Sequence, residues 1–508
     1  MQRQTARPAL ALALMAALVA CSDSSDRARD TAPPEPQYLS IPQPAVAAPP
    51  DAGAIALLST SFDLAEVGYE QQEYFISGSA SAFTNLGELG SDGRWEVEPG
   101  EQAQYRTRIV VYRPQNAADF SGTVLLEWLN VTAGFDTPPS YGSGHVEMLR
   151  AGHVWAGVSA QIVGIEGAEN PLVPLHLKAA QPERYASLEH PGDSFAYDIF
   201  AQAGQALRRP AELDLLNGLV PQRIIALGES QSAGRLVTFI NAVHPLYNAF
   251  DGYLVHSRGD GSPALAQAPQ VDIPTPPVVT IRDDLNVPVL NFQTETDVIA
   301  LGAVTDRQDD SDRFRLWEVA GSAHGDYYSF VAGRADTGQD PYFAVVVEQS
   351  AILGFIQCER PMNAGPMPWV FNAALRALEA WVKDGTAPPA APRLAVNDAG
   401  DALLRDSDGI ATGGIRTPYV DAPPGILTGE PNGGDPFCFL FGTTELFSAD
   451  HMAARYTDQA GYENAVAESA DAAVAAGFLL PQDAERIKAA AALQWQFLYD
   501  SCPLCAAP

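Results

Sequence analysis

A short stretch at residues 224–235 constrains the fold more than any other part of the chain. It reads IIALGESQSAGR, an apolar run followed by small residues and then by a helical pattern. A sharp strand-to-helix turn of this kind exposes a serine at the edge of a sheet, and it needs small neighbours because the backbone there is crowded. Gly228 stands two positions before Ser230, as such a turn requires. We therefore expect Ser230 to be a nucleophile.

The match to the turn pattern is incomplete and leaves a second register open. Ser232 stands two positions after Ser230, where glycine is usual. Ser232 could itself be the nucleophile, with Gly234 two residues later. The distance from the apolar run favours Ser230, because Ser232 would fall inside the following helix.

The rest of the chain predicts an α/β fold of the α/β-hydrolase type, with a mostly parallel central sheet flanked by helices. Strand-like and helix-like stretches alternate, which is typical of such a sheet. Strands are predicted at residues 107–112, 123–128, 154–158, 224–227, 253–256, 289–292 and 316–319, and helices at 194–207 and 371–383.

The 508 residues are long enough for a catalytic domain with additions at both ends. We expect a signal peptide at residues 1–20 and a Pro/Ala-rich tether at 21–55. The catalytic domain is predicted at 56–395. A loop-rich and helical C-terminal extension at 396–508 is expected to pack on that core, and residues 413–429 are a candidate lid.

The N-terminus predicts export. Arg3 and Arg7 precede an apolar run at residues 9–20 that is too short to span a bilayer, and the run ends in LVAC. This ending resembles a bacterial lipoprotein signal, which implies that Cys21 carries a lipid and anchors the protein in the periplasm or at the cell surface. The alternative is an ordinary secretory signal. Contact with a membrane is expected through this anchor alone.

Charge and cysteine content narrow the partners. The 30 basic and 62 acidic residues give a formal net charge of −32, which repels the phosphates of nucleic acid. A nucleic-acid partner is therefore not expected. Cys358, Cys438, Cys502 and Cys505 allow up to two disulfides in an exported chain, with the connectivity left open.

A serine nucleophile needs a base and a group that orients the base. Asp297 follows a predicted strand and is the expected acid, with Glu295 as its rival. His324 follows the next strand in a loop of small residues and is the expected base, with His256 as the alternative. The order serine, acid, histidine along the chain is the one that this kind of fold uses.

Other site residues are predicted with less support from the pattern. The backbone N–H of Gln231 is the expected donor to the oxyanion, and the side-chain amide of Asn130 is a candidate for the second donor. Arg258 could bind a substrate carboxylate, or instead pair with an acidic residue. Tyr327 and Tyr328 could form an aromatic wall, or pack in the core. No metal cluster, phosphate loop or dinucleotide motif is found, and no cofactor is expected.

Several motifs together resemble a known family. GESQSAGR, EWLNVT, LVHSRG, TETD and AGSAH are similar to those of bacterial exported α/β-hydrolase-domain proteins. The resemblance covers nearly all of the mature chain. It implies a serine esterase that cleaves a small-molecule carboxylic ester with Ser230, Asp297 and His324 as its triad. The same triad could cleave a lactone, an amide or a polyester, and a non-catalytic binding module at the cell surface is the alternative of a different class.

Overall fold

The structure is a computed structural model that describes residues 38–168, 173–352, 354 and 356–499. The residues from Tyr38 onward belong to one compact unit, the second of two into which the chain divides. The predicted signal peptide, Cys21, Cys502 and Cys505 lie outside the described residues. The description below concerns the second unit alone.

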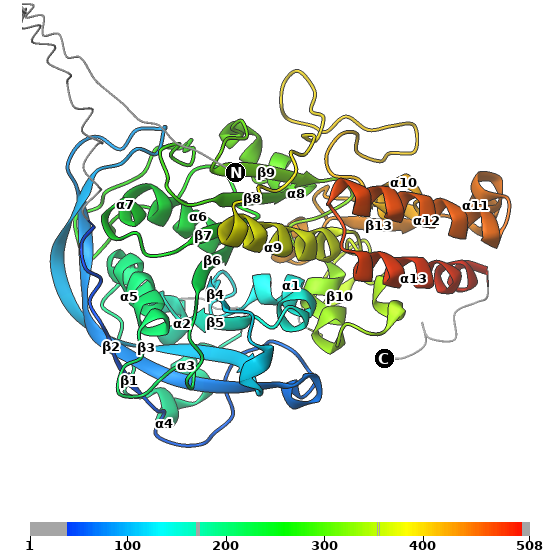
Figure 1. Cartoon of the computed structure of the whole chain (residues 1–508). Helices are drawn as coiled ribbons and strands as arrows, with labels where there is room; N and C mark the ends of the chain where they lie inside the picture. The colour runs from blue at the N-terminus through cyan, green and yellow to red at the C-terminus, as the bar shows by residue number, and fades with distance from the viewer. Residues whose placement is uncertain (1–37, 169–172, 353, 355, 500–508) are drawn as a thin grey trace, which may run out of the picture. The chain divides into compact units, whose positions relative to one another are not determined.

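A nine-stranded sheet forms the centre of this unit, in the order β1-β2-β3-β5-β4-β6-β7-β8-β9 (Figure 1). Every neighbouring pair from β5 to β9 is parallel, and β1, β2 and β3 join antiparallel at one edge. The predicted α/β fold with a mostly parallel sheet is thus confirmed. The strands are β1 (Ala45–Ala47), β2 (Tyr69–Asn85), β3 (Val97–Pro114), β4 (Thr123–Trp128), β5 (Val154–Val158), β6 (Arg223–Glu229), β7 (Gly252–His256), β8 (Val289–Thr294) and β9 (Phe314–Val319).

Helices cover both faces of the sheet, which explains why its parallel strands are continuous apolar runs. On one face Leu125 and Ile225 pack with α1 (Pro139–Arg150) and α9 (Met367–Asp384). On the other face their chain neighbours, such as Val124, pack with α5 (Ala196–Arg208) and α6 (Gln231–Thr238). Shorter helices are α2 (Ile162–Glu166), α3 (Leu177–Ala180), α4 (Pro182–Tyr185), α7 (His244–Tyr247), α8 (Glu295–Ile299) and α10 (Pro418–Asp421).

The antiparallel edge differs from the sequence prediction. The long pair β2 and β3 was predicted in part, since residues 107–112 are the end of β3 and β2 has no counterpart in the prediction. Ala45 of β1 pairs with Ser77 of β2. The predicted tether, which extended to residue 55, is therefore wrong in its last part. The Pro-rich composition of this segment gave no indication of a strand, because β1 forms through its hydrogen bonds with β2.

The C-terminal residues pack against the sheet rather than standing apart. Phe478 meets Trp317 of β9 with ring centroids 5.1 Å apart, and Arg150 of α1 pairs with Asp483 at 2.8 Å. This region contains α11 (Ala449–Tyr456), α12 (Gln459–Ala476), α13 (Pro481–Tyr499) and the antiparallel pair β12 (Gly425–Thr428) and β13 (Thr443–Leu446). No separate compact unit begins near residue 395.

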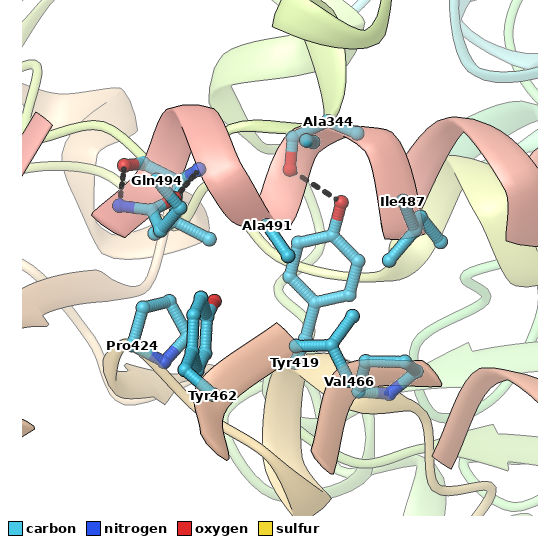
Figure 2. A pocket seen from close by; sticks show the side chains of 11 residues that line it. Ala344, Tyr419, Pro424, Tyr462, Val466, Ile487, Ala491 and Gln494 are labelled. Carbon is cyan, nitrogen blue, oxygen red and sulfur yellow. Dashed lines mark hydrogen bonds between the residues drawn. The ribbon is translucent and has the colours of Figure 1, made fainter. Parts of the chain in front are cut away.

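The interior of this helical region is closely packed. Figure 2 shows the space between α12, α13 and α10, where Tyr419 donates a hydrogen bond to the carbonyl oxygen of Ala344 at 3.0 Å. The cavity there measures about 20 Å³, roughly the room of one water molecule. The side chains around this space therefore pack closely and hold α10, α12 and α13 together.

A disulfide joins two distant parts of the chain. Cys358 and Cys438 are bonded, with their Cα atoms 5.4 Å apart, and both side chains are buried. Cys358 lies just beyond a small antiparallel pair, β10 (Ala351–Ile352) and β11 (Ile356–Gln357). Cys438 lies in a 3-10 helix, η9 (Pro436–Leu440).

Among the described residues, no helix has both the length and the apolar character that a membrane span requires.

Candidate active site

Ser230 occupies a strained turn between β6 and α6. Its backbone has φ 57° and ψ −120°, a conformation that costs a non-glycine residue about 1–3 kcal/mol. The Ser230 N–H donates to the carbonyl oxygen of His256 at 2.9 Å. A Cβ atom at Gly228 would lie 2.7 Å from the carbonyl oxygen of Ser232, so the turn requires glycine there. The predicted strand-turn-helix element is present.

Ser232, the alternative nucleophile, faces the inside of the turn. Its hydroxyl donates to the carbonyl oxygen of Glu229 at 2.8 Å, and the side chain is fully buried. The residue that replaces the usual glycine therefore ties the first turn of α6 to the end of β6. Its position explains how the turn forms despite the incomplete motif.

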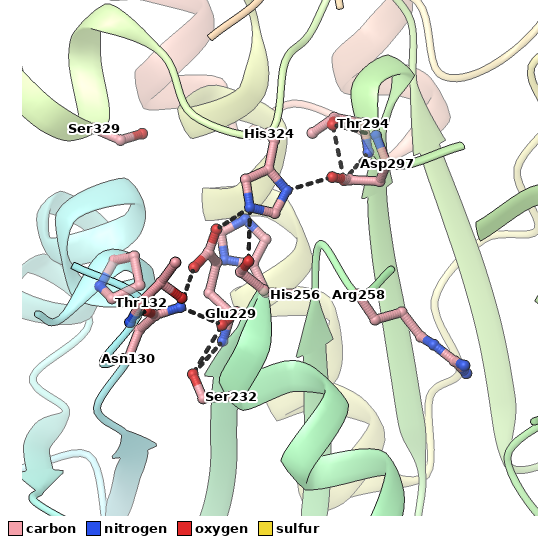
Figure 3. Close-up of polar contacts among 12 residues, drawn as sticks. Asn130, Thr132, Glu229, Ser232, His256, Arg258, Thr294, Asp297, His324 and Ser329 are labelled. Carbon is pink, nitrogen blue, oxygen red and sulfur yellow. Dashed lines mark hydrogen bonds and ion pairs between the residues drawn. The ribbon is translucent and has the colours of Figure 1, made fainter. Parts of the chain in front are cut away.

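The three residues expected to act together do lie together (Figure 3). Nε2 of His324 is 2.9 Å from Oγ of Ser230, and Nδ1 of the same ring is 2.6 Å from Oδ1 of Asp297. Asp297 is fully buried at the start of α8. Its other carboxylate oxygen accepts hydrogen bonds from the N–H and the hydroxyl of Thr294 at 2.7 and 2.8 Å. These contacts fix the carboxylate on the Nδ1 side of the ring.

The rival acid and the rival base are engaged elsewhere. Glu295 accepts from the N–H groups of Gly321 and Gly429 and from Arg405, and these bonds connect α8 to the C-terminal region. The ring of His256 packs on Phe371, with centroids 4.3 Å apart. Burial and, to a smaller extent, the charge of His324 lower the pKa of His256 to about 3, so its ring stays neutral.

A fourth side chain at the base was missed by the sequence interpretation. Oε1 of Glu229 lies 3.2 Å from Nε2 of His324, the nitrogen that also contacts Ser230. Figure 3 shows Glu229 between His324 and Asn130. Its place in the sequence was a usable signal, since the last residue of β6 and the first residue of the turn share one edge of the sheet.

The charges in this cluster set its protonation. Burial lowers the pKa of His324, but the negative charges of Glu229 and Asp297 and the hydrogen bond that Nδ1 donates to Asp297 outweigh burial and raise it to about 9. Burial raises the pKa of Glu229 to about 7, although the charge of His324 opposes this. The two neighbouring carboxylates thus favour the protonated form of His324.

The two predicted oxyanion donors differ in their environment. Gln231 is the first residue of α6, where a backbone N–H has no partner within the helix. The side-chain amide of Asn130 donates to the carbonyl oxygen and the carboxylate of Glu229 at 3.0 and 3.2 Å. Its amide oxygen accepts from the N–H of Thr132 at 2.8 Å. Asn130 as oxyanion donor is therefore wrong, because its N–H groups hold Glu229 in place.

Arg258 does not face the site, so its prediction as a substrate-binding residue is wrong and the alternative, pairing with an acidic residue, is confirmed. It is 1% exposed, and Figure 3 shows it extending away from His324. The guanidinium pairs with Asp306 at 2.5 Å and donates to the carbonyl oxygens of Gly261 and Val279. Arg258 thus fastens the loop beyond β7.

The predicted aromatic wall of Tyr327 and Tyr328 is also wrong. The Tyr328 hydroxyl donates to Asp336 at 2.7 Å, and its ring packs on Trp369. Both tyrosines line a different cavity, of about 20 Å³, in which Ser230 takes no part. The sequence after His324 does not show in which direction the two tyrosine rings point. In the structure, the helical turn that follows directs Tyr328 toward Asp336 and Trp369.

Two cavities meet at Ser230. One is an open groove of about 710 Å³. The other, of about 100 Å³, also reaches His324. Residues of η9 line both, whereas Gly429, in the candidate lid at 413–429, lines a separate cavity beside Glu295. The part of the extension that covers the serine is therefore η9.

Within the described ranges, no three His, Cys, Asp or Glu side chains gather as metal ligands do. The buried side chains around Ser230 are an acid pair, an imidazole and an amide, and polar contacts join them to one another.

Comparison with known proteins agrees with this architecture. The sequence model of a family described as alpha/beta hydrolase domain matches residues 41–489. Comparison with curated protein sequences finds no match.

Solved structures with partial likeness include three enzymes. The structure of acetyl xylan esterase 1 from Thermoanaerobacterium sp. JW/SL YS485 is 10% identical with a TM-score of 0.22, over 43% of this chain and 53% of that one. A glucuronoyl esterase from Solibacter usitatus is 14% identical (TM-score 0.23; 45% and 55% covered). A putative dienelactone hydrolase from Klebsiella pneumoniae is 12% identical (TM-score 0.24; 48% and 85% covered). The match spans about half the length of the first two proteins.

Proposed function

The chain belongs to the alpha/beta hydrolase domain family, and we propose that it hydrolyses carboxylic esters with Ser230 as nucleophile, His324 as general base and Asp297 as the residue that orients His324. The observation that carries this proposal is the continuous contact from Ser230 Oγ to His324 Nε2 at 2.9 Å and from His324 Nδ1 to Asp297 at 2.6 Å. Esters are the bond class that the motif resemblance implies.

The reaction follows from these contacts. Ser230 Oγ attacks the ester carbonyl carbon while its proton passes to Nε2 of His324. The carbonyl oxygen becomes an oxyanion, to which the Gln231 N–H donates. When the tetrahedral intermediate collapses, the carbon–oxygen bond to the alcohol breaks and His324 returns the proton to that alcohol. Water then attacks the acyl carbon while its proton passes to His324. The bond from that carbon to Ser230 Oγ breaks, His324 returns the proton to Oγ, and the acid leaves.

The test compares two neighbouring serines. Purified protein should hydrolyse a short alkyl ester such as ethyl acetate, and Ser230→Ala should lower kcat by a factor of about 10⁴ or more. Ser232→Ala is the matched control, since its hydroxyl supports the turn and its loss should cost about tenfold at most. An alkyl fluorophosphonate should label Ser230, as read by peptide mass spectrometry.

Two outcomes would contradict the proposal. Equal activity in Ser230→Ala and wild type would remove the nucleophile. A native protein that neither turns over esters nor reacts with the fluorophosphonate would favour a non-catalytic binding module instead.

We also propose that the protein is exported and anchored through a lipid on Cys21. The disulfide between Cys358 and Cys438 supports this, because disulfides form and persist in oxidising compartments. Radioactive palmitate should be incorporated into the wild-type chain in bacteria and not into Cys21→Ser. Retention of Cys21→Ser in the membrane fraction would contradict the anchor.

A further inference from the structure

The two cavities that meet at Ser230 differ in size, lining and access to the base. We infer from them that the preferred ester has a small apolar alcohol part and a large, polar acyl part without negative charge. This inference rests on the proposed esterase function and adds the substrate class. Each of its components comes from a different wall of the site.

The smaller cavity is apolar and aromatic. Apart from the reacting groups, its lining includes Phe330, Ile356, Phe437 and Phe441. At about 100 Å³ it is smaller than a 150 Å³ cavity that accepts benzene. Asn130, Thr132, Thr137 and Glu229 add polar groups to the lining, so the volume is what sets the limit. Such a space favours a short alkyl group and is too small for a sugar ring.

The larger groove is open and is lined by loop backbone, by polar side chains and by apolar side chains such as Leu301 and Phe439. Gly259, Ser262 and Thr275 lie along it, together with the exposed carboxylate of Asp260. Its volume of about 710 Å³ is in the range of sites that hold drug-sized molecules. A long polar group can lie there with its hydroxyls still in contact with water. Asp260 and the strongly acidic surface disfavour an anion in this groove.

The position of His324 decides which part of the ester enters which cavity. His324 must return a proton to the departing alcohol oxygen, so that oxygen has to lie beside Nε2. His324 lines the smaller cavity and does not line the groove, whereas Gln231, the expected oxyanion donor, lines the groove. The alcohol part therefore belongs in the aromatic cavity and the acyl part in the groove.

One short helix separates the two cavities. Phe437 of η9 lines the aromatic cavity, Phe439 lines the groove, and Leu440 lines both. Cys438 lies between Phe437 and Phe439 in this helix, and its disulfide to Cys358 fixes the helix at that point. The divider is thus fixed to the body of the protein, and each cavity can be altered from its own side.

The first experiment uses esters of one polar acyl group, such as a neutral oligosaccharide uronic ester or hydroxy acid ester, with alcohols of increasing size. We expect kcat/KM to fall at least tenfold between methyl or ethyl and decyl alcohol. Lengthening the acyl part at constant methyl alcohol should change kcat/KM by less than threefold. The reverse pattern, with tolerance for large alcohols and a sharp limit on the acyl part, overturns the inference.

The second experiment uses a matched pair of variants. Phe437→Ala should restore about tenfold of the activity toward large alcohols and leave the acyl preference unchanged. Phe439→Ala, on the other side of η9, should leave the alcohol preference unchanged. Asp260→Lys should raise kcat/KM for anionic acyl groups relative to neutral ones. Thermal melting checks that each variant folds, and equal effects of both phenylalanine variants on alcohol size contradict the assignment.

Failure of the inference is distinguishable from failure of the proposed function. Labelling of Ser230 by a small fluorophosphonate depends on the nucleophile and base and not on the size preferences. A labelled protein with the wrong preferences would leave the esterase proposal standing, whereas an unlabelled, inactive protein would remove both.

Discussion

The two sides of the His324 ring differ in how their carboxylates are built. On the Nδ1 side, Asp297 is held by Thr294, three residues away in the same turn. On the Nε2 side, Glu229 is held by Asn130, which comes from the end of another strand. The first carboxylate has a local, self-contained support, and the second depends on the packing of two strand ends.

The two carboxylates also differ in what their surroundings do. Burial raises the pKa of Glu229 to about 7, so this group can lose or gain a proton near neutral pH. Asp297 accepts hydrogen bonds from Thr294 as well as from His324, and these bonds fix its orientation. The comparison suggests that Asp297 fixes the orientation of the ring and Glu229 adjusts its charge.

The largest effect should come from the orienting side. Asp297→Asn should lower kcat by a factor of about 10⁴, because an amide at Nδ1 favours the wrong tautomer of His324. Glu295→Gln is the control, since Glu295 bonds to Arg405 and backbone away from His324. Steady-state kinetics on a short ester measures both. A comparable loss of kcat in Glu295→Gln would mean that the acid has been misassigned.

Glu229→Gln should change the pH dependence more than the rate. The base works when neutral, so kcat/KM rises as pH increases through the pKa of His324, which Glu229 and Asp297 raise to about 9. Removing one negative charge lowers that pKa, and the midpoint of the acidic limb should move down by about one unit. The limiting kcat should fall about tenfold, as the imidazolium loses a partner. An unshifted limb with a lower rate would give Glu229 a purely structural role.

Asn130→Ala separates two roles with different magnitudes. Loss of an oxyanion donor costs about 10²–10³ in kcat. If Asn130 holds Glu229, as its hydrogen bonds indicate, the loss should stay below tenfold. Loss of the hydrogen bond from Asn130 should raise the pKa of Glu229, because that bond lowers it. The acidic limb of the pH profile should then shift slightly in the direction expected for Glu229→Gln. A hundredfold loss with an unshifted limb would return Asn130 to the oxyanion site.

The smallest effect is expected at the support of Asp297. Thr294→Val removes the hydroxyl that donates to Asp297 and caps α8, while Thr294→Ser keeps it. We expect a loss of about 1 kcal/mol in the free energy of unfolding and a few-fold loss of kcat in the valine variant. Chemical denaturation and ester kinetics measure the two. Equal behaviour of the valine and serine variants would show that the turn holds Asp297 without Thr294.

The parallel half of the sheet and the order of the acting residues could be predicted because both are local. Apolar runs bounded by small residues gave β4 and β5 with the bounds observed and gave β6 nearly so. The turn at Ser230 and the strand ends before Asp297 and His324 follow from the same pattern. Parallel strands then bring their carboxyl ends to one edge, which unites residues that are far apart in the chain.

What could not be predicted depends on direction and on distant contacts. Arg258 and Tyr328 follow strands at the correct edge, yet each side chain turns toward a buried acid, Asp306 or Asp336. The strand β1 has too few apolar residues to stand alone and exists through its pairing with β2. The aromatic cavity needs Phe437 and Phe441, whose sequence surroundings are those of an ordinary loop.

The late position of η9 in the chain affects the stage at which the wall between the two cavities forms. The chain is synthesised from its N-terminus, so Ser230, Asp297 and His324 are complete before the residues that divide the two cavities have been made. Cys438 then has to find Cys358, which happens where thiols are oxidised. In a reduced chain, η9 would lack the covalent bond that fixes it between the two cavities. The final division of the two cavities therefore depends on the oxidation that joins these two cysteines.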